Sequence, residues 1–195
     1  MPLPPDEAHQ HAIRRLGVFL REAEDTLASW DAYSDRHTDQ DGWPHDETAY
    51  GFRQARRDAD TWRAFTTVRG AAAAMLDTAE AQLSRLPADS TSLRRGWHLK
   101  VLRTALKEVN ALQSEWLGVH DTLPASARPG TEEYDEPLAE RNAGAWAYLD
   151  AWALHGQSVI DIDTAARAKP SVKPAASALA PTLPSKAGST AWARR

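Results

Sequence analysis

The chain of 195 residues contains no cysteine. Disulfide bonds, thiol catalysis and zinc sites built on cysteine are therefore excluded. No apolar run approaches the roughly 20 residues that cross a membrane as a helix. Residues 1–6 also lack the basic and apolar regions of a signal peptide. We therefore expect a soluble cytoplasmic protein without a membrane partner.

The motifs of the common catalytic sites are missing as well. The sequence has no phosphate-binding glycine loop, no Gly-x-Ser-x-Gly nucleophile motif and no His-Glu-x-x-His zinc helix. It also lacks the two Glu-x-x-His pairs of ferritin-like di-metal bundles. These absences favour an interaction protein over an enzyme.

The clearest positive signal is an apolar stripe between residues 93 and 123. Apolar side chains recur there at alternating spacings of three and four, which places them on one face of a helix. These side chains are Leu102, Ala105, Val109, Leu112, Trp116, Val119 and Leu123. Leu99 and Leu106 widen the stripe, so a single partner helix would leave apolar surface in water. The stripe therefore predicts a bundle.

Three further amphipathic helices are predicted, over residues 6–37, about 46–86 and about 135–162. Proline separates them at Pro44, Pro87 and Pro124, where the chain cannot continue as a helix. Large apolar side chains such as Phe52 are expected on the inner side of the second helix. Four tryptophans are expected in the core for the same reason. They are Trp30, Trp62, Trp116 and Trp152.

Four long amphipathic helices with three fairly short connections predict an all-α fold. The arrangement expected over residues 1–168 is an antiparallel up-down-up-down four-helix bundle. The same pattern would support two helical hairpins that pair only in a homodimer. From Lys169 onward, prolines are spread through alanine, serine and lysine. We therefore predict that residues 169–195 form a disordered, basic Pro/Ala-rich tail.

Charge is distributed unevenly along the chain. Residues 1–45 carry 4 basic and 9 acidic side chains, whereas residues 169–195 carry 5 basic side chains and no acidic one. In an up-down bundle the first and third connections meet, which would bring Asp39 and Asp41 near Glu132 and Glu133. We therefore predict one acidic end and, opposite it, a basic end with the tail. Such polarity favours docking of a partner through the charged ends.

The same topology suggests a metal site. In a regular bundle His9, Glu80, His98 and His155 would converge in one layer at the tail end. A shift of about two residues in the third turn would replace His155 by Asp161. Histidine and carboxylate ligands suit zinc, iron or manganese, so the possible cofactor is a divalent transition metal. The alternative is that these are hydrogen-bonded residues at the end of the core.

The end of the chain has the form of a docking peptide. Trp192 supplies one aromatic anchor, and Arg194 and Arg195 supply charge beside a free carboxylate. An unselected chain end is the alternative. From this composition we predict that the tail binds a protein partner.

Nucleic acid is a further candidate partner, because Arg53, Arg56, Arg57 and Arg63 form a basic run. Asp58 and Asp60 interrupt that run, and the net charge of the chain is −4. A helical face with surface ion pairs explains the run better. We therefore expect a non-enzymatic helical-bundle interaction or adaptor protein. The alternatives are a metal-binding four-helix bundle and a nucleic-acid-associated accessory protein.

Overall fold

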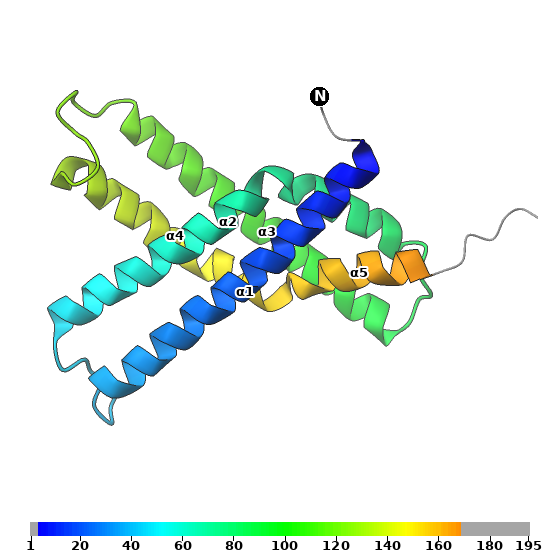
Figure 1. Ribbon diagram of the computed structural model, residues 1–195, viewed down its shortest axis with the longest axis horizontal. Coiled ribbons are helices and arrows are strands. Elements are labelled where there is room, and N and C mark those ends of the chain that lie inside the picture. Colours follow the sequence, from blue (N-terminus) through cyan, green and yellow to red (C-terminus); the bar gives the residue numbers. More distant parts are fainter. Residues whose placement is uncertain (1–3, 169–195) are drawn as a thin grey trace, which may run out of the picture.

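The computed structural model describes residues 4–168, which form five α-helices (Figure 1). They are α1 (Pro5–His37), α2 (Glu47–Leu83), α3 (Ser90–His120), α4 (Glu132–His155) and α5 (Gln157–Ala168). The predicted all-α, antiparallel up-down-up-down arrangement is confirmed, with the fourth predicted helix divided into α4 and α5. None of the helices in residues 4–168 is long and apolar enough to span a membrane.

Local sequence signals explain where the helices begin and turn. The carboxylate of Asp46 accepts a hydrogen bond from the backbone of Ala49 and caps α2. Asp89 caps α3 in the same way through Ser92. These bonds satisfy amide groups that have no partner within a helix. Gly42 and Gly130, in the connections before α2 and α4, have φ angles of 84° and 97°, a conformation that favours glycine.

The helices do not run side by side along their whole length. Figure 1 shows that the hairpin of α1 and α2 crosses the hairpin of α3 and α4. The core lies at this crossing, where the ring of Phe65 on α2 contacts Phe19 on α1 and Trp152 on α4, with centroid distances of 5.2 and 5.1 Å. All three side chains are buried. Toward its tip, each hairpin forms an arm that the other hairpin does not cover (Figure 1).

The crossing corrects several predictions about the core. The stripe on α3 is buried from Leu99 to Val109, but Val119 is 43% exposed. Phe52, predicted to face inward, is 75% exposed. On its arm Tyr50 packs instead, with its ring 4.9 Å from that of Trp30. The reason is geometric, because an apolar residue toward the tip of a hairpin can pack only against the other helix of that hairpin.

The prediction of one acidic end is also wrong. Figure 1 shows the tips of the two hairpins diverging to separate corners of the molecule. Asp39 and Asp41 therefore lie on one tip, and Glu132 and Glu133 lie on the other. The two tips would have met if the four helices ran side by side along their whole length. The crossing of the hairpins keeps the tips apart.

A break at Gly156 divides the predicted fourth helix. The chain turns there and continues as α5, whose Val159 and Ile162 enter the core. A Cβ atom at Gly156 would lie 2.6 Å from the carbonyl oxygen of Trp152 and 3.0 Å from a methyl group of Leu20. Glycine thus lets the α4–α5 junction approach α1 closely.

We expect Gly156→Ala to lower the free energy of unfolding by about 1–3 kcal/mol, because the new methyl group overlaps the backbone. Gly70→Ala is the matched control, since Gly70 lies within α2 and a Cβ atom there would meet no atom within 4 Å. That control is expected to stabilise the helix by about 0.5–1 kcal/mol. Urea denaturation measures both. Equal effects of the two substitutions would contradict the close approach at Gly156.

Candidate functional site

The four predicted metal ligands are not brought together. His98 and His155 are near each other, but their rings stack with centroids 4.6 Å apart and planes inclined by 21°. Stacked rings hold their nitrogen atoms in separate planes, so the two do not aim at one ion. His98 forms a hydrogen bond through Nδ1 with the Ser158 hydroxyl. Burial, with the neighbouring His155 and Arg94, lowers the pKa of His98 and favours its neutral form.

The other two predicted ligands have different partners. Glu80 accepts a hydrogen bond from Nε of Arg103 at 3.1 Å, and His9 contacts Asp163. Within residues 4–168, no group of three or more histidine or carboxylate side chains is arranged to hold a metal ion. The predicted layer of metal ligands required four helices that run side by side along their whole length. The crossing of the hairpins and the break at Gly156 destroy that alignment.

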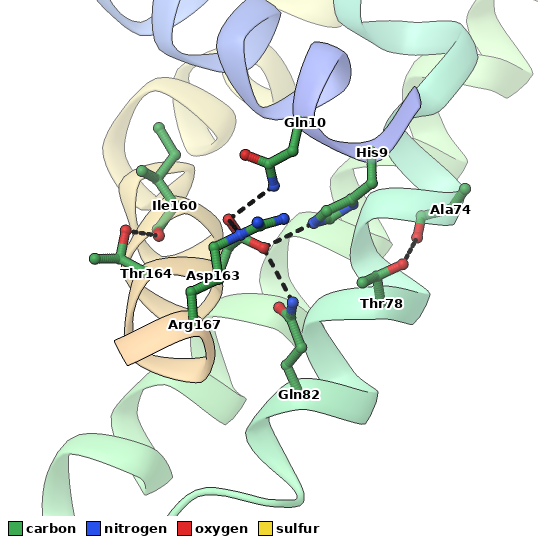
Figure 2. A network of polar contacts seen from close by, with 9 residues as sticks. All are labelled: His9, Gln10, Ala74, Thr78, Gln82, Ile160, Asp163, Thr164 and Arg167. Atoms are coloured by element: carbon green, nitrogen blue, oxygen red, sulfur yellow. Dashed lines mark hydrogen bonds and ion pairs between the residues drawn. The ribbon is translucent and has the colours of Figure 1, made fainter. Parts of the chain in front are cut away.

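The most connected polar residue is Asp163 on α5, which the sequence did not single out (Figure 2). Its residue surface is only 4% exposed. Its carboxylate accepts hydrogen bonds from His9 Nε2 at 3.0 Å, Gln10 Nε2 at 3.1 Å, Gln82 Nε2 at 3.0 Å and Arg167 Nε at 2.9 Å. The donors come from α1, α2 and α5. This Asp163 cluster therefore ties the first helix to the last.

The electrostatics of the cluster indicate a structural role. Burial alone would raise the pKa of Asp163, but the hydrogen bonds from Gln82, Gln10, Arg167 and His9 together outweigh it and lower that pKa to about 2. A carboxylate with so low a pKa stays ionised near neutral pH and is a poor proton acceptor. The arrangement can hold three helices together but is unsuited to general base catalysis.

A second buried charge joins α1, α2 and α4. The guanidinium of Arg57 lies between two indole rings, 4.5 Å from the centroid of Trp30 and 4.0 Å from that of Trp146. Its Nη2 atom lies 2.7 Å from the carboxylate of Asp58, and the two side chains are 9% and 2% exposed. Burial raises the pKa of Asp58, although Arg57 opposes this shift. Arg57 and Asp58 therefore form a largely desolvated ion pair at the place where α1, α2 and α4 meet.

Arg141 on α4 is held in a similar way. Its guanidinium lies 4.0 Å from the ring centroid of Trp62 and 4.9 Å from that of Trp116, and it donates hydrogen bonds to Asn142 and Gln113. Burial lowers the pKa of Arg141 to about 10, at which it remains charged near neutral pH. Of the four tryptophans predicted in the core, Trp62 and Trp152 are buried. Trp30 and Trp116 are only half-buried and cover arginines instead.

The basic run on α2 carries its own counter-charges. Asp60 lies 3.6 Å from Arg56 and 2.6 Å from Arg63, and Arg53 donates a hydrogen bond to the Ser29 hydroxyl. Together with the pairing of Arg57, these contacts match the interpretation of the run as a face with ion pairs.

An apolar groove opens between α1 and the junction of α4 and α5. Its volume is about 430 Å³. Five apolar side chains line it, which are Leu20, Leu27, Ala28, Ala153 and Leu154. Leu154 is 66% exposed, which is high for a leucine beside other apolar side chains. The α1 groove, as we call it, therefore presents apolar surface to water.

The wall that α1 contributes to the groove is acidic. Leu20, Glu24, Leu27 and Asp31 follow one another along α1 at spacings of four, three and four, so carboxylates and leucines share one face. Between residues 22 and 35 the helix carries five acidic side chains and no basic one. The groove can thus offer an apolar contact and a carboxylate to the same bound segment.

Trp192, Arg194 and Arg195 lie outside the residues that the structure describes, so the docking peptide at the end of the chain stays a prediction. The apolar stripe of the fourth predicted helix did not indicate the α1 groove, because Leu154 lies off that stripe. A single glycine inside a helical pattern, at position 156, was the signal that could have located the break beside it.

Comparison of the chain with protein-family models, with curated proteins and with solved structures found no match.

Proposed function

We propose that the chain is a non-enzymatic interaction protein that binds a basic peptide segment of a protein partner in the α1 groove. The observation that carries the proposal is the 66% exposure of Leu154 beside four other apolar side chains. Apolar surface in water costs about 25 cal/mol for each Å². A segment that covers Leu154 would recover part of that free energy.

The composition of the groove defines what it would bind. Its volume of about 430 Å³ is in the range of about 300–1,000 Å³ that is typical of ligand sites. The apolar floor fits one large apolar anchor of a partner. Glu24 and Asp31 would pair with basic residues beside that anchor and would speed association through their charge.

The groove walls are supported by buried polar joints. The Asp163 cluster holds α5 against α1 and α2, and Arg57 holds α4 against both through Trp146 and Trp30. Walls fixed in this way lose little conformational entropy on binding. The metal-binding and nucleic-acid alternatives have less support, because the four predicted ligands do not converge and because Asp58 and Asp60 pair with three arginines of the run.

The test uses Leu154→Glu, which places a charge on the apolar floor. Its matched control is Leu93→Glu, since Leu93 is a leucine on α3 with 77% exposure that does not line the groove. The probe is a fluorescein-labelled peptide with one tryptophan and three arginines. We expect Leu154→Glu to weaken its binding at least tenfold, and Leu93→Glu to change it less than twofold.

Fluorescence polarisation measures the binding. All proteins carry Trp192→Ala, so that the tryptophan of residues 169–195 cannot compete with the probe. A peptide with glutamate in place of the arginines is expected not to bind. Equal affinities of the two leucine variants would contradict the proposed site.

A further inference from the structure

We propose that the segment occupying the α1 groove is part of this same chain, namely residues 169–195 with Trp192 as the anchor. The inference rests on the proposed function, that is, on a groove that binds basic segments with an apolar anchor. It adds the identity of the resident segment. It also implies that an external partner must displace that segment before it binds.

Charge complementarity is the first argument. Residues 169–195 carry five basic side chains and no acidic one. The α1 wall of the groove presents the carboxylates of Glu24 and Asp31, and none of the described residues that line the groove is basic. Opposite charges of this kind favour the association and fix its orientation.

The residues around Trp192 also match the groove in the spacing of apolar and charged groups. Trp192 stands between two alanines and is followed by Arg194 and Arg195, so apolar area and positive charge lie within four residues. On α1 the leucines and carboxylates of the groove alternate over a similarly short distance. The indole can bury against the leucines while an arginine reaches Glu24 or Asp31.

The length of the chain allows this contact within one molecule. Gln157 lines the groove and begins α5, which ends at Ala168. Eleven helical steps place the end of α5 roughly 17 Å farther on. The 24 residues from 169 to 192 span up to about 80 Å when extended. Tethering would give the anchor a millimolar effective concentration at the groove.

The absence of cysteine makes a direct test possible. The full chain with Ser189→Cys carries one thiol, to which a nitroxide spin label is attached. We expect the methyl NMR signals of Leu27 and Leu154 to lose more than half of their intensity while the label is paramagnetic. Leu117, on the arm of α3 and α4, is expected to keep its intensity. Trp192→Ala in the labelled chain is expected to restore the signals of Leu27 and Leu154.

Two controls distinguish a contact within one molecule from a contact between two copies of the chain. The loss of intensity is expected to survive a tenfold dilution. It should be absent when a labelled chain without isotope enrichment is mixed with an enriched chain without label. Broadening in that mixture would overturn the inference, because the segment would then come from a second copy. Unchanged Leu27 and Leu154 signals in the labelled chain would overturn it as well.

A last arm distinguishes this inference from the proposed function. A synthetic peptide of residues 186–195 is added to the chain with Trp192→Ala, and we expect it to shift the Leu154 signals. Such a shift without broadening in the spin-labelled chain would refute occupation by the chain's own segment and leave the groove as a binding site. If neither this peptide nor the arginine-rich probe binds, both proposals are wrong.

Discussion

Replacing Asp163 by alanine is expected to lower the free energy of unfolding by about 3 kcal/mol. The carboxylate is 4% exposed and accepts hydrogen bonds from four side chains on three helices. Its removal leaves buried donors without an acceptor and removes the counter-charge of Arg167. Because Arg167 is half-exposed, the loss stays below that of a fully buried ion pair. Urea denaturation near neutral pH measures the change.

The same residue is expected to govern stability in acid. The pKa of Asp163 is about 2 in the folded chain, against an ordinary value of 3.8. Because the folded pKa is the lower one, the stabilisation is complete above pH 4 and is lost as the pH falls toward 2. The difference in pKa corresponds to roughly 2 kcal/mol. Asp163→Asn should therefore flatten the decline of unfolding free energy between pH 4 and pH 2.

A neighbouring carboxylate provides the control for this pH dependence. Asp161 lies on the same helix and accepts a hydrogen bond from Gln157. Asp161→Asn is expected to leave the slope of stability against pH close to that of the unmodified chain. If Asp163→Asn also leaves the slope unchanged, the buried carboxylate is not the group that titrates.

Replacing Arg57 by methionine is expected to cost about 3 kcal/mol of unfolding free energy. The substitution keeps apolar volume between Trp30 and Trp146 but removes the cation that both indoles cover. It also leaves the carboxylate of Asp58, only 2% exposed, without its counter-charge. Arg56→Met is the matched control, since the adjacent Arg56 is 71% exposed and its ion-pair distance to Asp60 is 3.6 Å. Its effect should stay within about 0.5 kcal/mol.

A double variant identifies the origin of this loss. Asp58→Asn in the Arg57→Met background removes the unpaired charge, so we expect the double variant to be more stable than Arg57→Met alone. Chemical denaturation of the four proteins gives the coupling between the two positions. A cost of Arg57→Met no greater than that of Arg56→Met would show that the stacked guanidinium contributes little.

The helices were predictable because their signals are local. Asp46 and Asp89 cap the helices that the sequence placed after them, and the spacing of apolar residues located the buried faces near Leu102 and Trp152. The angle between the hairpins was not predictable. An apolar stripe shows which face is buried, whereas the packing of side-chain ridges into grooves determines how two helix pairs cross. The 43% exposure of Val119, which lies on the stripe but toward the tip of its hairpin, follows from that angle.

The sites were less predictable, because sequence patterns assign charged residues to the surface. Arg57 and Asp163 are buried, and only contacts between distant helices explain how their charges are satisfied. The histidine layer failed for a related reason. His9 and His98 were assigned to one layer by counting residues along helices that were assumed to run side by side. Because the two hairpins cross, residues at equal distances along the helices do not lie in one layer.

The Asp163 cluster also affects the order in which the fold can form. The pairs of helices with the most extensive packing are α1 with α2 and α3 with α4, which are consecutive along the chain, and such local contacts favour rapid folding. The contact between His9 and Asp163, in contrast, joins residues 154 positions apart. During synthesis from the N-terminus, α1 and α2 can pair early, but their shared core face stays open until α4 emerges with Trp152. A nascent chain therefore exposes Phe65 until most of the chain has been made, and α5, whose Asp163 contacts His9 and Gln82, is the segment that completes the packing.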